Sequence, residues 1–312
     1  MNILVQGTGL IAEEYCKICS DLGYATNVVG RSEESTKSFT ERTGISAVAG
    51  GLANNLALAD SCTHSIIAVS EDQLGTVLLD TAKAGISNIL VEKPGAATIH
   101  QLNQLNVEIA KTNANVYIAY NRRYFSSVVE LIERIKTDGG CTSFHFEFTE
   151  WSHVIKDLIK NPGVLENWGW HNSSHVIDLA FFVGGSPNRI SSYVSGGLDW
   201  HPTGSVFTGS GIADNGAHFT YHSNWEGPGR WSLEFITRHN RYLLAPMEGI
   251  QVQKIGTIPR EPIELDDELD NKWKPGFYLQ TRDFLKANPG CLKTLTEQVD
   301  DLAHYEKIFR GT

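Results

Sequence analysis

Short apolar runs alternate with helical patterns through the first 120 residues of the chain. Strands are predicted at residues 2–6, 26–29, 64–69, 89–91 and 116–119. Apolar residues at helical spacing indicate helices at residues 11–22, 73–84 and 99–112. Strands that alternate with helices of this length predict βαβ units around a parallel sheet. We therefore expect residues 1–120 to form a doubly wound Rossmann domain.

The pattern changes after residue 120. A helical segment at residues 126–136 is followed by longer runs of β-branched and aromatic residues, separated by turn clusters such as Glu226-Gly-Pro-Gly. These runs are residues 142–149, 190–195, 217–224 and 231–237. Such runs are typical of an antiparallel sheet. The sequence thus predicts an α/β protein whose second domain, residues 121–312, is α+β, with a mostly antiparallel sheet covered by helices on one face only.

Composition and charge exclude several kinds of partner. Hydrophobic residues make up 41% and charged residues 20% of the chain, which is ordinary for a globular protein. The formal net charge of −10, without any Lys/Arg-rich run, would repel the phosphates of a nucleic acid. No apolar run approaches the roughly 20 residues that cross a bilayer. The start of the chain lacks a signal-peptide pattern, and five scattered cysteines suit a reducing compartment. We expect a cytoplasmic protein that binds neither nucleic acid nor membrane.

The first predicted strand leads into a glycine-rich turn, Gly7-Thr8-Gly9-Leu10-Ile11-Ala12, which opens the first helix. This is the context that a G-x-G-x-x-A dinucleotide fingerprint requires. Gly7 permits the tight turn, Gly9 lets the backbone approach a pyrophosphate, and Ala12 allows close packing of helix on strand. An ordinary glycine turn is the alternative. Cofactor contacts are predicted for Gly7, Thr8, Gly9, Leu10 and Ile11.

The end of the second predicted strand bears on the choice of cofactor. About 20 residues after the glycines, an NAD enzyme usually places an acidic residue on the ribose hydroxyls. Gly30 stands at that position here, followed by Arg31 and Ser32. These two side chains could bind a 2′-phosphate through a charge-assisted bond and a hydroxyl, although Arg31 could also be a solvated loop residue. The sequence favours NADP and leaves NAD possible.

Two further motifs follow in the chain. Glu92-Lys93-Pro94-Gly95 comes directly after a predicted strand, and Tyr-Asn-Arg-Arg at residues 120–123 closes the last strand of the first domain. In this order and spacing, and with the glycine turn, they resemble the glucose–fructose oxidoreductase / inositol dehydrogenase / MocA family. The resemblance extends to residues 172–182 and to the Lys274-Pro-Gly-Phe-Tyr stretch. It implies hydride transfer between a nicotinamide and a secondary alcohol of a sugar, cyclitol or nucleotide-linked sugar, in a homodimer or homotetramer formed through the open sheet face.

The resemblance gives Lys93 a catalytic role beside the nicotinamide. Hydride loss from a carbinol requires removal of the hydroxyl proton or stabilisation of the alkoxide, and a desolvated ammonium can do either. Asn121 and Arg122 are expected near the cofactor, with a strand-end cap and a surface ion pair as equal alternatives. The resemblance also implies cofactor contacts from Val69, Glu92 and Lys93. It implies substrate contacts from Lys93, Asn172, His175 and Tyr278.

The predicted helix at residues 168–182 departs from the family pattern. Many members carry an Asp four residues before a His, here His175, but position 171 is a second histidine. Spacings of four and three place His171, His175 and Asp178 on one helix face. We expect His175 to share the proton of the reacting hydroxyl with Lys93, and His171 to assist. Buried core histidines are the alternative, and no metal is expected because neither an H-E-x-x-H motif nor a cysteine ligand set accompanies the pair.

Two other functions are compatible with the same fold, because fold alone does not determine function. One is a regulator that binds a dinucleotide without turnover. The other is an NAD-dependent glycoside hydrolase that uses a transient oxidation. Intact Lys93 and His175 argue against the regulator.

Overall fold

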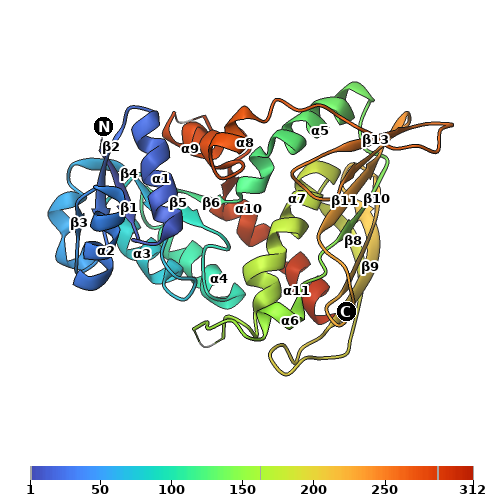
Figure 1. Ribbon diagram of the computed structural model, residues 1–312. Coiled ribbons are helices and arrows are strands. Elements are labelled where there is room, and N and C mark those ends of the chain that lie inside the picture. Colours follow the sequence, from blue (N-terminus) through green and yellow to red (C-terminus); the bar gives the residue numbers. More distant parts are fainter. Residues whose placement is uncertain (1, 162, 287, 312) are drawn as a thin grey trace. The chain divides into compact units, whose positions relative to one another are not determined.

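The computed structural model describes residues 2–161, 163–286 and 288–311 and divides into two compact units (Figure 1). Unit 1 contains the chain up to Asn121 together with Asn271–Asp300. Unit 2 contains Arg122–Asp270 and the residues from Asp301 onward. A segment near the C-terminus, which the sequence analysis assigns to the second domain, thus packs in the same unit as the N-terminal residues.

Unit 1 is built on a seven-stranded sheet, sheet A. Its strands lie in the order β15-β6-β5-β4-β1-β2-β3, and all neighbours are parallel except β15 and β6. From the other edge the parallel strands follow the order 3-2-1-4-5-6 of dinucleotide-binding sheets, which confirms the predicted Rossmann fold. The strands are β1 (Asn2–Gln6), β2 (Ala25–Val29), β3 (Ala47–Val48), β4 (Cys62–Ile67), β5 (Asn88–Glu92), β6 (Asn115–Ala119) and β15 (Lys293–Thr294).

Helices pack against sheet A and bury its apolar strands. The central strand β1 buries Ile3, Leu4 and Val5 completely, as expected for a parallel strand that is covered on both faces. The connecting helices are α1 (Leu10–Asp21), α2 (Glu33–Thr43), α3 (Leu74–Lys83) and α4 (Ile99–Ile109). The later segment contributes α9 (Phe277–Leu285) and α10 (Leu295–Asp300), and α8 (Glu268–Lys272) spans the boundary between the two units.

Unit 2 is built on an eight-stranded sheet, sheet B, in the order β14-β13-β12-β11-β7-β10-β9-β8. Neighbouring strands are antiparallel except β7 and β10, which confirms the predicted mostly antiparallel sheet. The strands are β7 (Ser143–Glu147), β8 (Pro187–Ser195), β9 (Val206–Ala213), β10 (His218–Asn224), β11 (Ser232–Ile236), β12 (Asn240–Leu244), β13 (Gln251–Lys254) and β14 (Glu261–Pro262).

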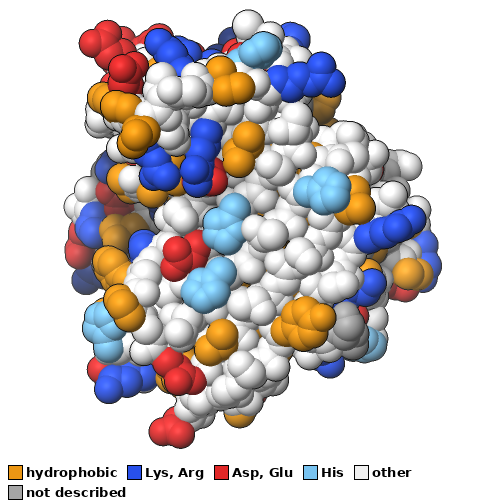
Figure 2. Space-filling model, turned by 90° about the vertical axis from the view of Figure 1, so that its right-hand side faces the viewer, with side chains coloured by type: hydrophobic (Ala, Val, Ile, Leu, Met, Phe, Trp, Pro, Cys, Tyr) orange, Lys and Arg blue, Asp and Glu red, His pale blue; other side chains and the backbone are white. Residues whose placement is uncertain are grey.

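One face of sheet B is covered and the other is open. On the covered face, Phe144 and Phe146 of β7 pack edge-on against Phe181 at 6.1 and 5.4 Å between ring centroids. On the open face, several histidines lie among uncharged groups, with acidic and basic side chains between them (Figure 2). The helices of the unit are α5 (Ser126–Thr137), α6 (Ser152–Ile155), a π-helix (Gly169–Ser173), α7 (Ser174–Gly184) and α11 (Leu302–Arg310).

The sequence pattern misses β9 because two glycines interrupt it. A Cβ at Gly209 would lie 2.4 Å from the Tyr221 ring, and one at Gly211 would lie 2.4 Å from the Phe219 ring. Both rings come from the neighbouring strand β10, so the glycines make room for aromatic packing inside the sheet. None of the described helices combines the length and the apolar character that a bilayer crossing requires.

Candidate active site

The glycine turn lies where the strand order of sheet A reverses, between β1 and β4. Gly7 has a φ of 124°, and its N–H donates to the Val29 carbonyl at 2.9 Å. A Cβ at this position would lie 2.2 Å from the Ala68 carbonyl oxygen, which follows β4. Only glycine fits here, because both the backbone conformation and the contact exclude a side chain. The structure places Gly7 at the switch point at which open α/β sheets bind ligands.

The residues after Gly7 leave the N-terminus of α1 accessible. A Cβ at Gly9 would meet no atom within 4 Å, and Leu10 is 75% exposed. Gly9 precedes the first turn of α1, whose leading N–H groups have no partner within the helix. Ala12 is fully buried at the base of the turn. This combination of open space and aligned N–H donors fits a dinucleotide pyrophosphate.

Arg42 ties the glycine turn to α2, a contact that no sequence motif signals. Its guanidinium donates to the Thr8 carbonyl at 3.1 Å and to Ser38 at 2.8 Å, and it pairs with Glu13 of α1 at 3.4 Å. The acceptor in the glycine turn, the Thr8 carbonyl oxygen, lies 34 residues before Arg42 in the chain. Local sequence therefore carries no trace of this contact.

The end of β2 lacks space for an acidic side chain. A Cβ at Gly30 would lie 2.6 Å from the Thr36 methyl and 2.7 Å from the Thr8 methyl. Arg31 and Ser32 are exposed beside it. The Ser32 hydroxyl accepts the Ser35 N–H at 3.3 Å and thereby caps α2, a role that the sequence analysis does not assign to it.

Lys93 follows the end of β5, and its neighbour Glu92 belongs to a chain of hydrogen bonds. The Tyr15 hydroxyl donates to Glu92 Oε1 at 2.8 Å, and Gln280 Nε2 donates to the Tyr15 oxygen at 3.1 Å. Although part of Glu92 is exposed, its carboxyl group is enclosed, and this burial raises its pKa. The Tyr15 hydrogen bond and the charges of Lys93 and Lys274 act in the opposite direction. Lys93 thus sits next to a carboxylate whose charge depends on neighbouring groups.

The C-terminal segment of unit 1 supports the turn after Lys93. Gln298 Nε2 donates to the Pro94 carbonyl at 3.4 Å and to the Tyr120 hydroxyl at 3.0 Å. Lys293, which is 1% exposed, has its Nζ 5.3 Å from the centre of the Tyr120 ring. Gln298 and Lys293 could not be predicted from the sequence, because they follow Lys93 by about 200 residues and belong to no motif.

Other predicted residues of unit 1 take structural contacts. Asn121 is buried and donates to the Pro275 carbonyl at 2.9 Å, in line with the strand-end alternative. The Tyr278 hydroxyl donates to Asp21 at 3.1 Å, and its ring stacks on Trp273. Val69 follows β4. Because the carboxyl ends of parallel strands meet at one edge, the structure brings together Gly7, Arg31, Val69, Lys93 and Asn121 along that edge of sheet A.

In unit 2, His171 lies in the π-helix and His175 in the first turn of α7. Both side chains are buried, with 3% and 6% of their surface exposed. The predicted α-helix is interrupted here, because residues Gly169–Ser173 form a π-helix, which takes more residues per turn than an α-helix. Such π segments occur frequently at functional sites.

The carboxylate of Asp178, in α7, is engaged by an arginine. Arg123 binds it with two hydrogen bonds, Nε to Oδ2 at 2.8 Å and Nη2 to Oδ1 at 2.7 Å. The Arg123 guanidinium also lies 4.3 Å from the centre of the Phe182 ring. Both charged residues are buried. This bidentate pair joins the segment after β6 to α7.

Glu150 is a functional candidate that the sequence analysis misses. It is 1% exposed and accepts hydrogen bonds from Asn172 at 3.0 and 3.1 Å and from Ser173 at 2.8 Å. Burial raises the pKa of Glu150, whereas these hydrogen bonds and the charge of Arg230 act to lower it. The carboxylate therefore anchors the π-helix that carries His171. Asn172, predicted to contact substrate, donates to Glu150.

Two arginines and a tryptophan lie near His175. The guanidinium carbons of Arg122 and Arg230 are 4.8 and 4.6 Å from the centre of the Trp231 ring. The His175 and Trp231 ring centroids are 6.3 Å apart. Two predicted site residues of unit 2, Arg122 and His175, thus both lie near the ring of Trp231. No sequence motif predicts a role for Trp231.

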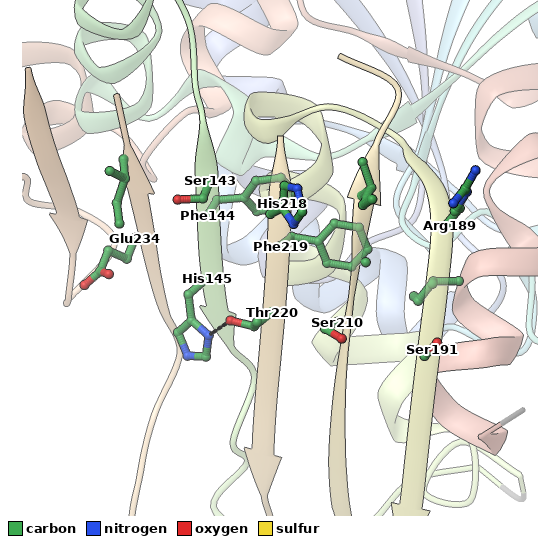
Figure 3. Close-up of a pocket in the computed structure, with 14 residues that line it drawn as sticks. Ser143, Phe144, His145, Arg189, Ser191, Ser210, His218, Phe219, Thr220 and Glu234 are labelled. Carbon is green, nitrogen blue, oxygen red and sulfur yellow. Dashed lines mark hydrogen bonds between the residues drawn. The ribbon is translucent and has the colours of Figure 1, made fainter. Parts of the chain in front are cut away.

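A hollow on sheet B, lined by both apolar and polar side chains, lies away from the histidine helix. It is open to solvent, and His145 bonds Thr220 at 2.8 Å in it (Figure 3). These side chains belong to the open face, whereas Phe144 and Phe146 of the same strand point to α7. The hollow is therefore separated from His175 by the sheet. Among the described residues, no group of three or more His, Cys, Asp or Glu side chains could hold a metal ion.

Known proteins share the N-terminal sequence pattern and the fold. The sequence profile of GFO_IDH_MocA, an oxidoreductase family with an NAD-binding Rossmann fold, matches residues 1–120. No curated protein sequence matches the chain. Similar solved structures include levoglucosan dehydrogenase in complex with NADH and levoglucosan, at 15% identity and a TM-score of 0.77, covering 99% of this chain and 96% of that one.

Two further structures extend the likeness. UDP-N-acetylglucosamine 3-dehydrogenase from Acidithiobacillus ferrooxidans has 13% identity and a TM-score of 0.74 over 99% of this chain and 96% of its own. A protein described as an NADPH-dependent oxidoreductase from Desulfitobacterium hafniense has 14% identity and a TM-score of 0.78 over 98% and 93%. At these identities the structures show the fold alone. Residues 1–120 thus resemble the NAD-binding Rossmann domain of the GFO_IDH_MocA oxidoreductase family.

Proposed function

We propose that the protein is an NAD(P)-dependent dehydrogenase or reductase that acts on a secondary alcohol or ketone of a sugar, cyclitol or nucleotide-linked sugar. The observation that carries this proposal is the switch point of sheet A, where Gly7 and Gly9 leave a helix N-terminus open to a pyrophosphate. The family match to an NAD-binding Rossmann fold and the two sugar dehydrogenases of like fold support it. A bound nicotinamide would supply the hydride acceptor or donor.

Lys93 is the proposed catalytic residue of unit 1. It follows the carboxyl end of β5, at the sheet edge that also carries Gly7 and at which open α/β sheets bind ligands. An ammonium there can donate to a substrate oxygen and stabilise negative charge as it develops. Glu92, held by Tyr15, orients the turn in which Lys93 lies.

His175 is the proposed proton-carrying residue of unit 2, with His171 in support. Both imidazoles are buried, and the π-helix that carries His171 is anchored by Glu150. A histidine changes charge near neutral pH, so it can accept the hydroxyl proton of an alcohol and return it to a ketone. The pH–rate profile should therefore have a limb near neutrality that His175→Asn removes. An unchanged profile in that variant would make the helix a scaffold.

NADP is the proposed preferred cofactor, with NAD as the alternative. Gly30 has no room for the carboxylate that would repel a 2′-phosphate, and exposed Arg31 and Ser32 follow it. Removing a charge-assisted phosphate contact costs about 1.5–3 kcal/mol. Arg31→Ala should therefore erase most of the preference for NADP in fluorescence titrations, whereas Lys37→Ala should not. Equal affinities of the unmutated protein for both cofactors would contradict this choice.

Nicotinamide absorbance tests the proposed reaction. The protein is mixed with NAD or NADP and a panel of sugars, cyclitols and glycosides, and Lys93→Met is compared with Lys37→Met, a change at an exposed lysine of α2. A dehydrogenase accumulates reduced cofactor, and Lys93→Met should lower its turnover by about 10²-fold. Sugar release without net reduction would indicate the glycoside hydrolase instead. Dinucleotide binding without turnover would indicate the regulator.

We also propose that the open face of sheet B pairs with a second copy of the chain. The face is broad and carries histidines and uncharged groups beside a few charged residues such as Arg189 and Glu234 (Figure 2). Thr220→Glu would place a charge in its middle and should lower the mass measured by light scattering. A monomeric mass for the unmutated protein would contradict this pairing.

A further inference from the structure

We infer that unit 2 carries a second ligand site, a pocket that binds a neutral sugar ring. The pocket lies between α6, the turn at residues 198–201 and the segment 225–227 that follows β10. We call it the tryptophan pocket, after Trp200 and Trp225 in its wall. Its lining residues differ from those of the glycine turn and of the histidine helix. The inference therefore goes beyond the proposed reaction and does not depend on it.

Two stacked indole rings belong to the wall of the tryptophan pocket. Trp225 is 1% exposed, and its Nε1 donates to the Phe148 carbonyl at 3.2 Å, so its ring is held in place. The Trp200 ring lies 5.6 Å from it between centroids, with 2° between the two planes, and is only partly buried. The face of an aromatic ring carries partial negative charge, which attracts the C–H groups on one side of a pyranose. A fixed, partly exposed indole is therefore a platform for a sugar ring.

A tight turn holds Trp200 and Asp199 at the pocket. Leu198 and His201 exchange two backbone hydrogen bonds, of 3.0 and 2.9 Å, so Asp199 and Trp200 form the corner between them. His201 is 3% exposed, its Nδ1 hydrogen-bonds a backbone carbonyl at 2.8 Å, and its ring lies 4.6 Å from that of Trp225. The turn is thus anchored before a ligand arrives, which lowers the entropy lost on binding.

Hydrogen-bonding groups lie around the two rings. Asp199 and Glu226 present exposed carboxylates, and the Ser205 hydroxyl donates to that of Glu226. Ser152 also lines the pocket, and its buried hydroxyl has no hydrogen-bond partner among the described residues, which leaves it for a ligand once the side chain turns. Carboxylates accept bonds from sugar hydroxyls, and a serine can donate or accept. The pocket thus combines the apolar and polar contacts that a sugar requires.

Size and charge select the class of sugar. The pocket has a volume of about 630 Å³, within the range of roughly 300–1,000 Å³ that is typical of small-ligand sites. Its charged side chains are the carboxylates of Asp199 and Glu226 and the ammonium of Lys156, with the His153 imidazole beside them. Two carboxylates and one ammonium give a net negative charge when His153 is neutral. Such a pocket repels a sugar phosphate, a sugar acid or a nucleotide and suits a neutral hexose or its glycosides.

Titration with neutral glycosides, followed by ligand-observed NMR, tests the inference. The full-length protein without dinucleotide is mixed with methyl β-D-glucoside, methyl β-D-galactoside, methyl α-D-mannoside, cellotriose or maltotriose. We expect at least one of them to bind in the millimolar range. Trp200→Ala removes the platform and should weaken this binding by about 10-fold. Asp199→Ala should weaken it by at least about 10-fold, because a hydrogen bond to a charged group is lost. Asp266→Ala, at an exposed aspartate between β14 and α8, should keep the affinity.

Two controls separate the pocket from the reaction site and from an acid-binding site. Binding should persist in His175→Asn, because His175 belongs to the proposed reaction site. Methyl β-D-glucuronide, which differs from methyl β-D-glucoside only at C6, should bind more weakly than the glucoside. Tighter binding of a trisaccharide would support the inference with a longer saccharide as the source of the ring, and equal binding would support it with a single sugar unit.

Melting temperatures show whether each variant is folded. If Trp200→Ala lowers the melting temperature, Asp199→Ala decides the test, because Asp199 is exposed. The inference is overturned if no glycoside binds at tens of millimolar, if neither variant weakens binding, or if binding disappears in His175→Asn. A glucuronide that binds as tightly as the glucoside would overturn the assignment to neutral sugars. The dehydrogenase proposal is tested by turnover, so it and the tryptophan pocket can fail independently.

Discussion

The glycine turn of unit 1 and the histidine helix of unit 2 are built in opposite ways. In the turn, the surface offered to a ligand is backbone, and glycines clear the space around it. In the helix region, the surface is made of side chains, and buried charges hold them: Arg123 on Asp178, and Asn172 and Ser173 on Glu150.

This difference predicts different weaknesses. A backbone site fails when an atom is added, because the chain has no room or the ligand can no longer approach. A side-chain site fails when a partner is removed, because the remaining charge is left buried without compensation. Added atoms should therefore damage the glycine turn of unit 1, whereas removed charged partners should damage the helix region of unit 2.

The largest effect is expected from Asp178→Ala. It leaves the Arg123 guanidinium buried without its bidentate carboxylate, and breaking a buried ion pair in this way costs about 3–5 kcal/mol. Chemical denaturation should show this loss in the free energy of unfolding. The double variant Arg123→Met/Asp178→Leu removes both charges and should recover most of it. A single variant that loses less than about 1 kcal/mol would show that the pair does not hold α7.

A smaller effect is expected when one methyl group is added to the turn. Gly7→Ala forces a non-glycine residue to a φ of 124° and against the Ala68 carbonyl, which costs at least about 1–3 kcal/mol of stability. Dinucleotide affinity should fall with it. Gly9→Ala is the matched control, because its φ of −84° is allowed and its Cβ meets nothing within 4 Å.

The Gly9→Ala control separates an effect on stability from an effect on dinucleotide binding. Gly9→Ala should keep the melting temperature while its methyl group weakens dinucleotide binding, measured by fluorescence titration. If Gly9→Ala binds NAD and NADP as tightly as the unmutated protein, the open space above Gly9 is not the pyrophosphate site.

The same contrast explains how much could be predicted from the sequence. The glycine turn is local, so the strand before it, Gly7 and the helix after it are adjacent in the chain and predict the Rossmann fold. The apolar pattern likewise predicts five of the seven strands of sheet A and four of the eight strands of sheet B to within a few residues. It misses β3 and β15 of sheet A and β9, β12, β13 and β14 of sheet B, and β9 was hidden by the glycines that its neighbour requires.

The supports of the candidate site were not predictable in this way. Glu150 and Arg230 come together from positions 80 residues apart, and Gln298 supports Pro94 across 204 residues. The π-helix before His175 could not be predicted, because residue spacings were interpreted with the period of an α-helix. Its anchor, Glu150, follows a strand that carries no motif.

The smallest effect concerns Glu92, where the glycine-built edge of unit 1 also depends on an enclosed charge. Burial raises the pKa of Glu92 above its ordinary value, and the Tyr15 hydrogen bond opposes that rise. A carboxyl group with a raised folded pKa favours folding at low pH, and the folded state loses this advantage as the pH rises through that pKa.

Tyr15→Phe removes the opposing bond, so the folded pKa of Glu92 should rise further. The pKa of Tyr15 is itself raised well above 10 by burial, so its hydroxyl stays protonated and donates over the whole range. The variant should therefore be destabilised more at pH 8 than at pH 5, by on the order of 1 kcal/mol for each unit of further rise. Melting curves at both pH values measure this difference, with Tyr24→Phe, a partly exposed tyrosine, as the control. A destabilisation that is equal at both pH values would mean that Tyr15 contributes packing and its bond to Gln280, and that the charge of Glu92 does not depend on it.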